Sequence, residues 1–295
     1  KDDTVCTIGN FDGVHKGHKF IIEELKKLAE EKELKTLVIT FYPHPRKILN
    51  PSEYKCSIVN LETKIDLLKS AGIDYILVID FDKNFYQKKS EEFLNFLKEK
   101  TKCKFIIVGK DWKFGYKRTG DVNFAKSLEG KLGYKIYVME DIQEENKRIS
   151  SSYIRDLLKD GNLEKVSQLI GRDYYLIDRV VEGDKKGREF GFPTINLKPP
   201  EDICLKKGVY AGYLCFENKC QKAVINYGNR PTVDGTKTFL EAHIIEDVKI
   251  NPKPNDFVKI IFKRYIRPEQ KFGSIEELKD QITLDIKKAL EVLDG

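Results

Sequence analysis

The chain has 295 residues, of which 40% are hydrophobic, and this suffices for two domains with separate cores. The net charge is +6, but charges of both signs are interleaved along runs such as residues 19–35 and 98–104. Such mixing is typical of a solvated surface rather than a nucleic-acid-binding face. No apolar stretch is long enough to span a bilayer and no secretory signal opens the chain. We therefore expect a cytoplasmic protein without nucleic-acid or membrane partners, and the sequence leaves its oligomeric state open.

The six cysteines are scattered along the chain and show no pattern of a shared site. They form no Cys-x-x-Cys pair, and no histidine pair accompanies them at zinc-binding spacing. We therefore expect neither a zinc site nor a disulfide framework, but ordinary thiols at Cys6, Cys56, Cys103, Cys204, Cys215 and Cys220.

The first half of the chain alternates short apolar runs with amphipathic segments. The runs predict strands and the segments predict helices, which together indicate a doubly wound parallel sheet with helices on both faces. Ligands bind such sheets at the carboxyl ends of the strands. The predicted strands are residues 4–8, 36–40, 75–79, 105–108 and 135–138, and the predicted helices are residues 19–31, 61–71, 90–99 and 122–132.

The most informative motif connects the first predicted strand to the first predicted helix. Residues 9–18 read Gly-Asn-Phe-Asp-Gly-Val-His-Lys-Gly-His. A strand-to-helix turn directs unpaired backbone N–H groups and the positive end of a helix dipole at one point, and glycines let an anion approach closely. His15 and His18 can add donors to the same anion. The alternative is a glycine turn with two exposed histidines, but the flanking strand and helix favour a phosphate site.

Three further loops carry unusual residues at the same predicted edge. They are residues 40–46, with Pro-His-Pro, residues 108–115, with Asp-Trp-Lys-Phe-Gly, and residues 148–155, with a serine run before Arg155. Taken singly, these are a rigid loop, a packed turn and a helix cap. Four such loops on one edge favour a substrate site.

The second half reads differently, with successive strands and one closing helix. Turns rich in glycine and proline separate the strands, and Ser274 is the expected N-cap of the helix. This pattern predicts a small antiparallel β-barrel with a terminal helix, and Gly171 marks the boundary between domains of residues 1–172 and 173–295. The predicted strands are residues 175–182, 209–216, 221–227, 239–245 and 257–263; the helices are residues 154–159, 163–170 and 275–293.

A glycine-rich basic loop, residues 183–196, enters one strand of this second half. It is either a plain hairpin with exposed lysines or a cradle for polyphosphate, because glycines expose backbone N–H groups. The hydroxyl of Thr194 and the amide of Asn196 are suited to the accompanying metal. Glu241, taken alone, is an outward residue on an alternating strand.

These motifs resemble the bacterial bifunctional riboflavin kinases and FAD synthetases. The resemblance rests on residues 9–18, 40–46, 108–115 and 149–155, and it continues through Gly-Phe-Pro-Thr-Ile-Asn, Gly-Val-Tyr-Ala and Asn-Tyr-Gly-Asn-Arg-Pro-Thr. It implies that residues 1–172 form a Rossmann-like nucleotidyltransferase of the His-x-Gly-His class. It also implies that residues 173–295 form a six-stranded riboflavin kinase barrel. Riboflavin is then phosphorylated by ATP to FMN, and FMN is adenylylated by a second ATP to FAD with release of pyrophosphate.

The resemblance also implies roles for individual residues. Catalytic roles fall to His15, His18, Arg155 and Glu241. Binding of ATP and its phosphates falls to Gly9, Asn10, Phe11, Asp12, Gly17, Ser151, Gly183, Lys185, Gly187, Arg188, Thr194 and Asn196. Flavin binding falls to His44, Asp111, Phe114, Tyr210 and Arg267, and Mg²⁺ binding to Thr194 and Asn196.

Two alternatives stay open at this point. One is another His-x-Gly-His nucleotidyltransferase of the cytidylyltransferase kind, which explains neither Pro-His-Pro nor the second domain. The other is a catalytically silent flavin- or nucleotide-binding regulator, which the intact site residues disfavour. Residues 246–254 depart from the family, whose members commonly have an acidic segment ending in Leu-Tyr-Gly, and this affects loop shape and flavin affinity more than chemistry.

Overall fold

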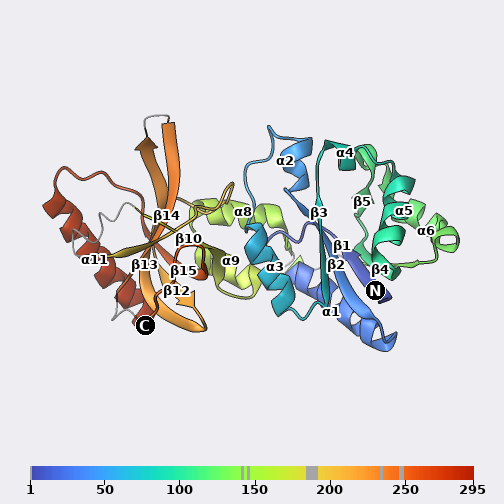
Figure 1. The fold of residues 1–295 in the computed structure, drawn as a ribbon, viewed down its shortest axis with the longest axis horizontal. Helices are drawn as coiled ribbons and strands as arrows, with labels where there is room; N and C mark the ends of the chain where they lie inside the picture. Colours follow the sequence, from blue (N-terminus) through green and yellow to red (C-terminus); the bar gives the residue numbers. More distant parts are fainter. Residues whose placement is uncertain (1, 141–142, 145–146, 184–191, 233–234, 246–248) are drawn as a thin grey trace. The chain divides into compact units, whose positions relative to one another are not determined.

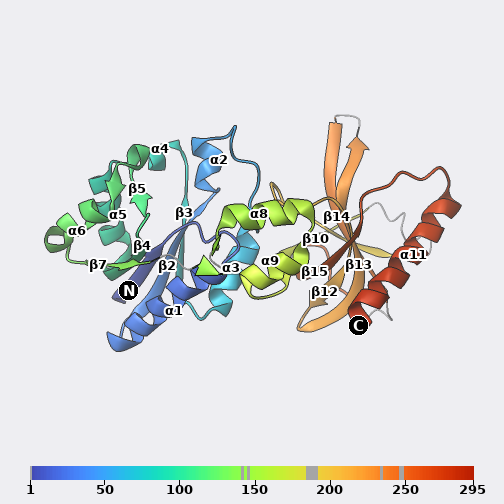
Figure 2. The same ribbon diagram turned by 180° about the vertical axis from the view of Figure 1, so that it is seen from behind.

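A computed structural model of the chain describes residues 2–140, 143–144, 147–183, 192–232, 235–245 and 249–295. The chain folds into two compact units. In Figures 1 and 2, the first unit is mostly blue to green and the second is mostly yellow to red. The first comprises residues 1–55 and 64–150, and the second comprises residues 56–63 and 151–295. The boundary predicted at residues 172/173 lies later in the sequence. Helices α8 (Ser151–Asp160) and α9 (Leu163–Ile170) belong to the second unit, where α9 contacts strands of the barrel.

The first unit is built on a five-stranded parallel sheet in the order β3-β2-β1-β4-β7, which confirms the predicted doubly wound fold. β1 has β2 on one side and β4 on the other, so the strand order reverses at β1. Ligand sites in such sheets form at this reversal, beyond the carboxyl ends of the strands. The strands are β1 (Thr4–Ile8), β2 (Lys35–Tyr42), β3 (Tyr75–Asp80), β4 (Cys103–Gly109) and β7 (Lys135–Met139).

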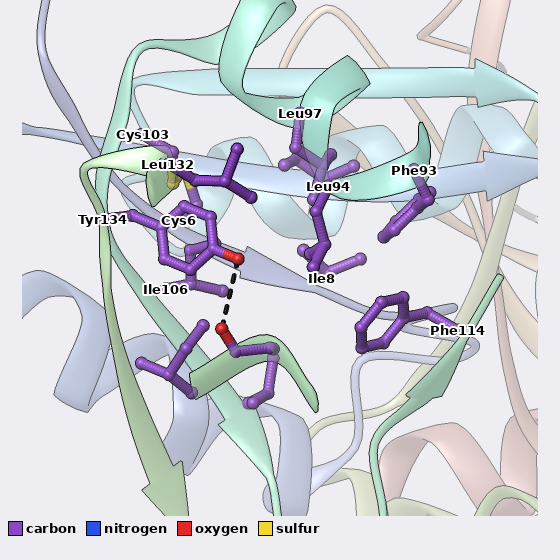
Figure 3. Packing of buried hydrophobic residues seen from close by; sticks show 14 of the residues in the cluster. Cys6, Ile8, Phe93, Leu94, Leu97, Cys103, Ile106, Phe114, Leu132 and Tyr134 are labelled. Carbon is purple, nitrogen blue, oxygen red and sulfur yellow. Dashed lines mark hydrogen bonds between the residues drawn. A yellow bond between two sulfur atoms is a disulfide. The ribbon is translucent and has the colours of Figure 1, made fainter. Parts of the chain in front are cut away.

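Helices cover both faces of this sheet. Helices α1 (Lys16–Glu31) and α3 (Leu61–Ser70) lie on one face, and α5 (Ser90–Thr101) and α6 (Val122–Ser127) lie on the other (Figures 1 and 2). Helix α7 (Glu129–Leu132) contacts both α5 and α6 and contributes Leu132 to the same core. Figure 3 shows the core on the second face, where Leu94 and Leu97 of α5 point toward Ile8 and Ile106 of the sheet. In the same core, the Tyr134 hydroxyl donates to the Ala125 carbonyl at 3.3 Å, which satisfies its buried polar group.

The short elements of the first unit were not predictable from periodicity. Helices α2 (Pro45–Leu49) and α4 (Lys83–Tyr86), the 3-10 turn Tyr116–Arg118, and the paired strands β5 (Lys113–Phe114) and β6 (Gly120–Asp121) are all too short to show a repeat. The single helix predicted over residues 122–132 is instead two helices, α6 and α7.

The second unit is a closed six-stranded barrel in the order β10-β11-β14-β13-β12-β15, and all its pairs are antiparallel, as predicted. Helix α11 (Ile275–Asp294) packs on the outside of the barrel (Figure 1), and Ser274 caps it by accepting a hydrogen bond from Glu277 N at 3.1 Å. The strands are β10 (Tyr174–Val181), β11 (Thr194–Leu197), β12 (Gly208–Phe216), β13 (Lys219–Thr232), β14 (Gly235–Ile244) and β15 (Phe257–Arg267).

Residues 56–63 interrupt the first unit in sequence and are anchored on the second. Tyr174 donates its hydroxyl to the Ile58 carbonyl at 2.7 Å, and the Asn60 amide donates to the Ile177 carbonyl at 2.8 Å. Ile177 N in turn donates to the Thr63 hydroxyl at 2.8 Å. Because Ile58 and Thr63 are fully buried, this segment is part of the second unit's core rather than a surface linker.

The prediction that the six cysteines are ordinary thiols was wrong, because the structure pairs all six in disulfides. Cys6–Cys103 joins β1 to β4, Cys215–Cys220 closes the β12–β13 hairpin, and Cys56–Cys204 ties residues 56–63 to the second unit. Sequence spacing does not report which residues neighbouring strands place side by side, so the pairing could not be derived from it. Among the helices in the described ranges, none combines the length and the apolar composition that a membrane span requires.

A glycine in β12 marks a close approach of two strands in the barrel. A Cβ at Gly212 would lie 1.9 Å from the Ile261 carbonyl oxygen of β15, at an irregularity of the β12–β15 register. We expect Gly212→Ala to destabilise the protein by about 1–3 kcal/mol, the usual cost of overpacking. Thermal unfolding measures this, with Gly130→Ala as the control because nothing lies within 4 Å of its Cβ position on α7. An unfolding midpoint of Gly212→Ala equal to that of the control would contradict the expectation.

Candidate functional site

The turn between β1 and α1 holds residues 9–15 in an unusual backbone conformation. Phe11 and Val14 have positive φ angles of 46° and 38°, which side chains rarely adopt, and Gly13 has 77°. His15 is the N-cap of α1. This helix, described along its whole length, carries no acidic residue in its first turn, so the helix itself does not neutralise its positive end. The turn therefore suits an anion.

The two imidazoles of the motif lie together. The rings of His15 and His18 stack with centroids 3.7 Å apart and planes 18° from parallel, and Phe11 packs against His18 at 5.0 Å. Gly17 makes this possible, because a Cβ there would lie 3.2 Å from the His15 ring. The structure thus brings together His15, Gly17 and His18 at the amino end of α1.

A buried lysine forms hydrogen bonds with this turn and with the end of β2. The ammonium of Lys64 on α3 donates to the carbonyls of Asn10 at 3.2 Å and Phe41 at 3.0 Å, and to the Thr40 hydroxyl at 3.2 Å. Lys64 is 8% exposed, and burial lowers its pKa to about 8, against a raising effect of the Asp12 carboxylate. Sequence reasoning missed Lys64. The available signal was helical spacing. Lys64 comes three and four residues before the buried Leu67 and Leu68, and this spacing places the lysine on the apolar face of α3.

A cavity of about 280 Å³ opens beside the same turn. Seven of its 17 lining residues are aromatic, and the rings of Trp112 and Phe114 stack at 4.2 Å. Gly9 and Asn10 line the cavity where it meets the β1–α1 turn. Three cations, Lys88, Lys113 and Arg118, also line it. The remaining lining residues are Ile8, Phe41, Pro45, Leu49, Phe81, Phe85, Tyr86, Phe93, Asp111 and Gly115. A planar aromatic ligand with an anionic end matches these walls.

Two of the three flavin residues predicted in the first unit lie on this cavity. Asp111 and Phe114 line it, whereas His44 does not. His44 caps α2 by accepting a hydrogen bond from Arg46 N at 3.2 Å, and its ring stacks on Tyr54 at 5.4 Å. These contacts place His44 directly before Pro45, which lines the cavity, and a contact of His44 with the flavin stays a prediction.

The predicted phosphate residues Ser151 and Arg155 lie on α8, which belongs to the second unit. α8 begins at Ser151, three residues before the predicted start at residue 154, so the second and third serines of the run lie in its first turn. A role of Ser151 and Arg155 beside the imidazoles stays a prediction.

The second unit aligns three polar residues across neighbouring strands. Asn196 of β11 pairs with Glu241 of β14, and Glu241 pairs on its other side with Asn226 of β13. Residues in register on antiparallel strands point to the same side of the sheet, and Thr194, two residues before Asn196, shares that side. The side-chain oxygen of Asn226 is buried and accepts no hydrogen bond from any residue that the structure describes.

Gly183, the first residue of the glycine-rich loop, lies against Asn196 of this row. A Cβ at Gly183 would lie 2.0 Å from the Asn196 amide nitrogen, so only glycine leaves room for that side chain. The hydroxyl of Thr194 and the amide oxygen of Asn196 are the oxygen ligands that Mg²⁺ accepts, with phosphates and water completing the shell. The residues present therefore fit Mg²⁺. Lys185, Gly187 and Arg188, also predicted to bind phosphate, lie outside the described residues.

Tyr210 and Arg267, which the resemblance assigns to flavin binding, both make contacts within the barrel unit. The Tyr210 ring is fully buried, packed against Phe262 and Tyr265, and burial raises the pKa of its hydroxyl. The Arg267 guanidinium makes hydrogen bonds of 2.7–3.1 Å to the buried Asp285 of α11. These contacts give both residues structural roles in the barrel, and their flavin contacts stay predictions.

Part of the segment that departs from the family is anchored to the barrel. Lys249 N and Ile250 N both donate to the side-chain oxygen of the buried Gln221, at 2.7 and 3.2 Å. Residues 246–248 lie outside the described residues.

Comparisons with known proteins cover both halves of the chain. The family model of FAD synthetase matches residues 1–153, and that of riboflavin kinase matches residues 170–293. A bifunctional riboflavin kinase/FMN adenylyltransferase from Escherichia coli K12 is 34% identical over 293 residues, which cover 99% of this chain and 93% of the relative. The protein of the same name from Bacillus subtilis 168 is also 34% identical, with 97% and 92% covered.

A solved structure shows the same architecture. It is described as a macrolide-efflux protein from Streptococcus pneumoniae, and it superposes with a TM-score of 0.79 at 27% identity over 97% of this chain and 93% of its own. Near-complete coverage by family models, relatives and fold leads to one assignment. The chain belongs to the family of bifunctional riboflavin kinases/FMN adenylyltransferases, with FAD synthetase in its first half and riboflavin kinase in its second.

Proposed function

We propose that the cavity beside the β1–α1 turn holds FMN for adenylylation, and that the row of Asn196, Glu241 and Asn226 is the centre of riboflavin phosphorylation. The observation that carries the first assignment is the continuity of the aromatic cavity with Gly9 and Asn10 of the turn. When the isoalloxazine ring of FMN stacks on these walls, the FMN phosphate can reach the turn, where ATP binds. ATP and the flavins are the substrates, and the cytoplasmic location stays a prediction.

Adenylylation at the first site requires positioning more than proton transfer. An oxygen of the FMN phosphate, already anionic at neutral pH, attacks the α-phosphorus of ATP while the bond to pyrophosphate breaks. The charge on the α-phosphate and on the leaving pyrophosphate is stabilised by N–H donors of the turn and by His15 and His18. Ser151 and Arg155 are proposed as further phosphate ligands.

Phosphorylation at the second site needs a base beside the attacking alcohol. The Glu241 carboxylate accepts the proton of riboflavin's terminal ribityl hydroxyl as its oxygen attacks the γ-phosphorus of ATP and ADP leaves. Asn226, next to Glu241 in register, offers its buried oxygen as an acceptor for a ribityl hydroxyl. Thr194 and Asn196 would hold Mg²⁺, which neutralises phosphate charge when bound.

Product analysis tests the proposal as a whole. The protein is incubated with riboflavin, ATP and Mg²⁺, and FMN and FAD are separated over time. We expect FMN first and FAD after it, and FAD alone when FMN replaces riboflavin. Absence of turnover with either flavin would favour the silent regulator, and a product formed with CTP but not ATP would favour the cytidylyltransferase.

The aromatic wall gives a prediction specific to the flavin cavity. We expect Trp112→Ala to raise the KM for FMN in adenylylation at least about tenfold, because loss of one stacking surface removes about 1.5 kcal/mol of binding. Steady-state kinetics measures this, with the KM for riboflavin in the kinase reaction expected within twofold of the wild type. Tyr137→Ala is the control, an exposed aromatic residue of the same unit outside the cavity. An unchanged KM for FMN in Trp112→Ala would remove the cavity from the flavin site.

A further inference from the structure

Lys64 is a buried cation with three hydrogen-bond acceptors around it. Its ammonium has three donors, and the structure shows three oxygens in reach, those of Asn10, Thr40 and Phe41. Neither the sequence motifs nor the reaction steps above use this residue. Burying a charged lysine is unfavourable unless its surroundings compensate, so a buried lysine at this position needs a physical reason.

The acceptors show which part of the site depends on this lysine. The Asn10 carbonyl also accepts a hydrogen bond from the Thr40 hydroxyl at 3.1 Å, so Lys64 and Thr40 together tie the turn to the end of β2. Directly after Asn10 come the positive φ angles of Phe11 and Val14. Such conformations cost about 1–3 kcal/mol each and persist only where the surroundings hold them.

The charge of Lys64 also acts on this turn. Asp12, on the same turn, is buried, with 4% of its surface exposed. Its carboxylate raises the pKa of Lys64, whereas burial lowers it more strongly. β2 presents the Thr40 hydroxyl and the Phe41 carbonyl to the ammonium. A positive charge beneath a phosphate-binding turn strengthens its attraction for an anion, because buried charges are weakly screened.

We propose that Lys64 is a positioning residue of the adenylyltransferase site, whose ammonium holds the turn of residues 9–14 in the conformation that presents its N–H groups and the two imidazoles to the phosphates of ATP. The inference rests on the proposed role of that turn in FAD formation. It adds a residue outside the sequence motifs, supplied by α3, on which the geometry of the motif depends.

The test compares Lys64→Met with Lys69→Met in the full-length protein. Both substitutions remove one lysine from α3, but Lys69 is exposed. We expect Lys64→Met to lower kcat for adenylylation at least about tenfold while riboflavin phosphorylation stays within twofold, and Lys69→Met to change neither. Trp112 is the single tryptophan and lies in the flavin cavity, so quenching of its fluorescence by FMN reports whether the first unit still binds flavin. We expect that affinity to stay within about threefold.

A pH profile separates positioning by the charged ammonium from a packing role. Lys64 is charged below its pKa of about 8, so kcat/KM for adenylylation should fall as pH rises through about 8. Phosphates bound at the turn stabilise the charged form of Lys64 and so raise its pKa in the enzyme–substrate complex. The fall in kcat should therefore begin at a higher pH than the fall in kcat/KM. In Lys64→Met this alkaline fall should be absent, and in Lys64→Arg, whose charge does not titrate, activity should exceed that of Lys64→Met without the fall.

The outcomes distinguish this inference from the proposed site itself. Wild-type kcat in Lys64→Met, or an alkaline fall near pH 8 that survives in that variant, would overturn the role of Lys64. Loss of flavin quenching together with activity would also overturn it, because the defect would then be unfolding of the unit. If His18→Ala too left adenylylation unchanged, the assignment of the turn would fail, whatever Lys64 does.

Discussion

A His18→Ala variant is expected to phosphorylate riboflavin at the wild-type rate and to form FAD at least about a hundredfold more slowly. Removal of one donor aimed at transition-state charge typically costs about 3 kcal/mol, which corresponds to that factor. His18 stacks on His15 at the amino end of α1, where the helix and the turn also direct their N–H groups. The measurement is the single-turnover rate of FMN to FAD, with the kinase rate of the same preparation as the control for folding.

Two further variants sharpen this test. His18→Gln keeps a side-chain N–H donor and should recover part of the lost rate. The double variant His15→Ala/His18→Ala should lose less than the product of the two single effects, because stacked residues that act on one group are not additive. Adenylylation by His18→Ala within threefold of the wild type would refute the role of the imidazoles.

Glu241→Gln should produce the opposite separation of activities. The amide keeps the shape of the side chain but cannot accept the proton of the ribityl hydroxyl, so riboflavin phosphorylation should fall by about 10²–10⁴. Conversion of supplied FMN to FAD should be unchanged. Parallel assays with riboflavin and with FMN as the starting flavin measure both.

The matched control is Glu291→Gln, which removes one exposed carboxylate from α11 of the same unit. It should leave both activities at wild-type level. If Glu241→Gln phosphorylated riboflavin normally, the carboxylate would have no part in the chemistry. A wild-type protein that binds both flavins but turns over neither would point to the silent alternative.

The fold was largely readable from the sequence, because most of its elements carry a clear hydrophobic period. β1 and α9 begin and end where predicted, and β12 differs by one residue. The strand order of the first sheet was not readable. It follows the usual rule for parallel crossovers, but periodicity does not say which strand lies next to which. Short elements such as α2 escaped for the same lack of a repeat.

The site was readable where its residues lie in one loop and not where they come from distant segments. The turn that contains His15 and His18 was predicted from local signals, and the structure stacks the two rings. The pairing of Asn196 with Glu241 depends on the register of two strands, and the two residues are 45 positions apart in the sequence. Lys64 was hidden because a lysine in an amphipathic helix is ordinarily solvated, and only its buried partners distinguish it.

The excursion of residues 56–63 into the second unit determines how the protein can be divided. A fragment that ends at residue 153 or 172 keeps this segment but loses the barrel that covers Ile58 and Val59. A fragment that starts at residue 170 keeps Tyr174 and Ile177 but loses their hydrogen-bond partners. Three chain crossings link the units, so no single proteolytic nick or gene truncation yields both halves intact. The two sites are therefore produced together, one of each per chain.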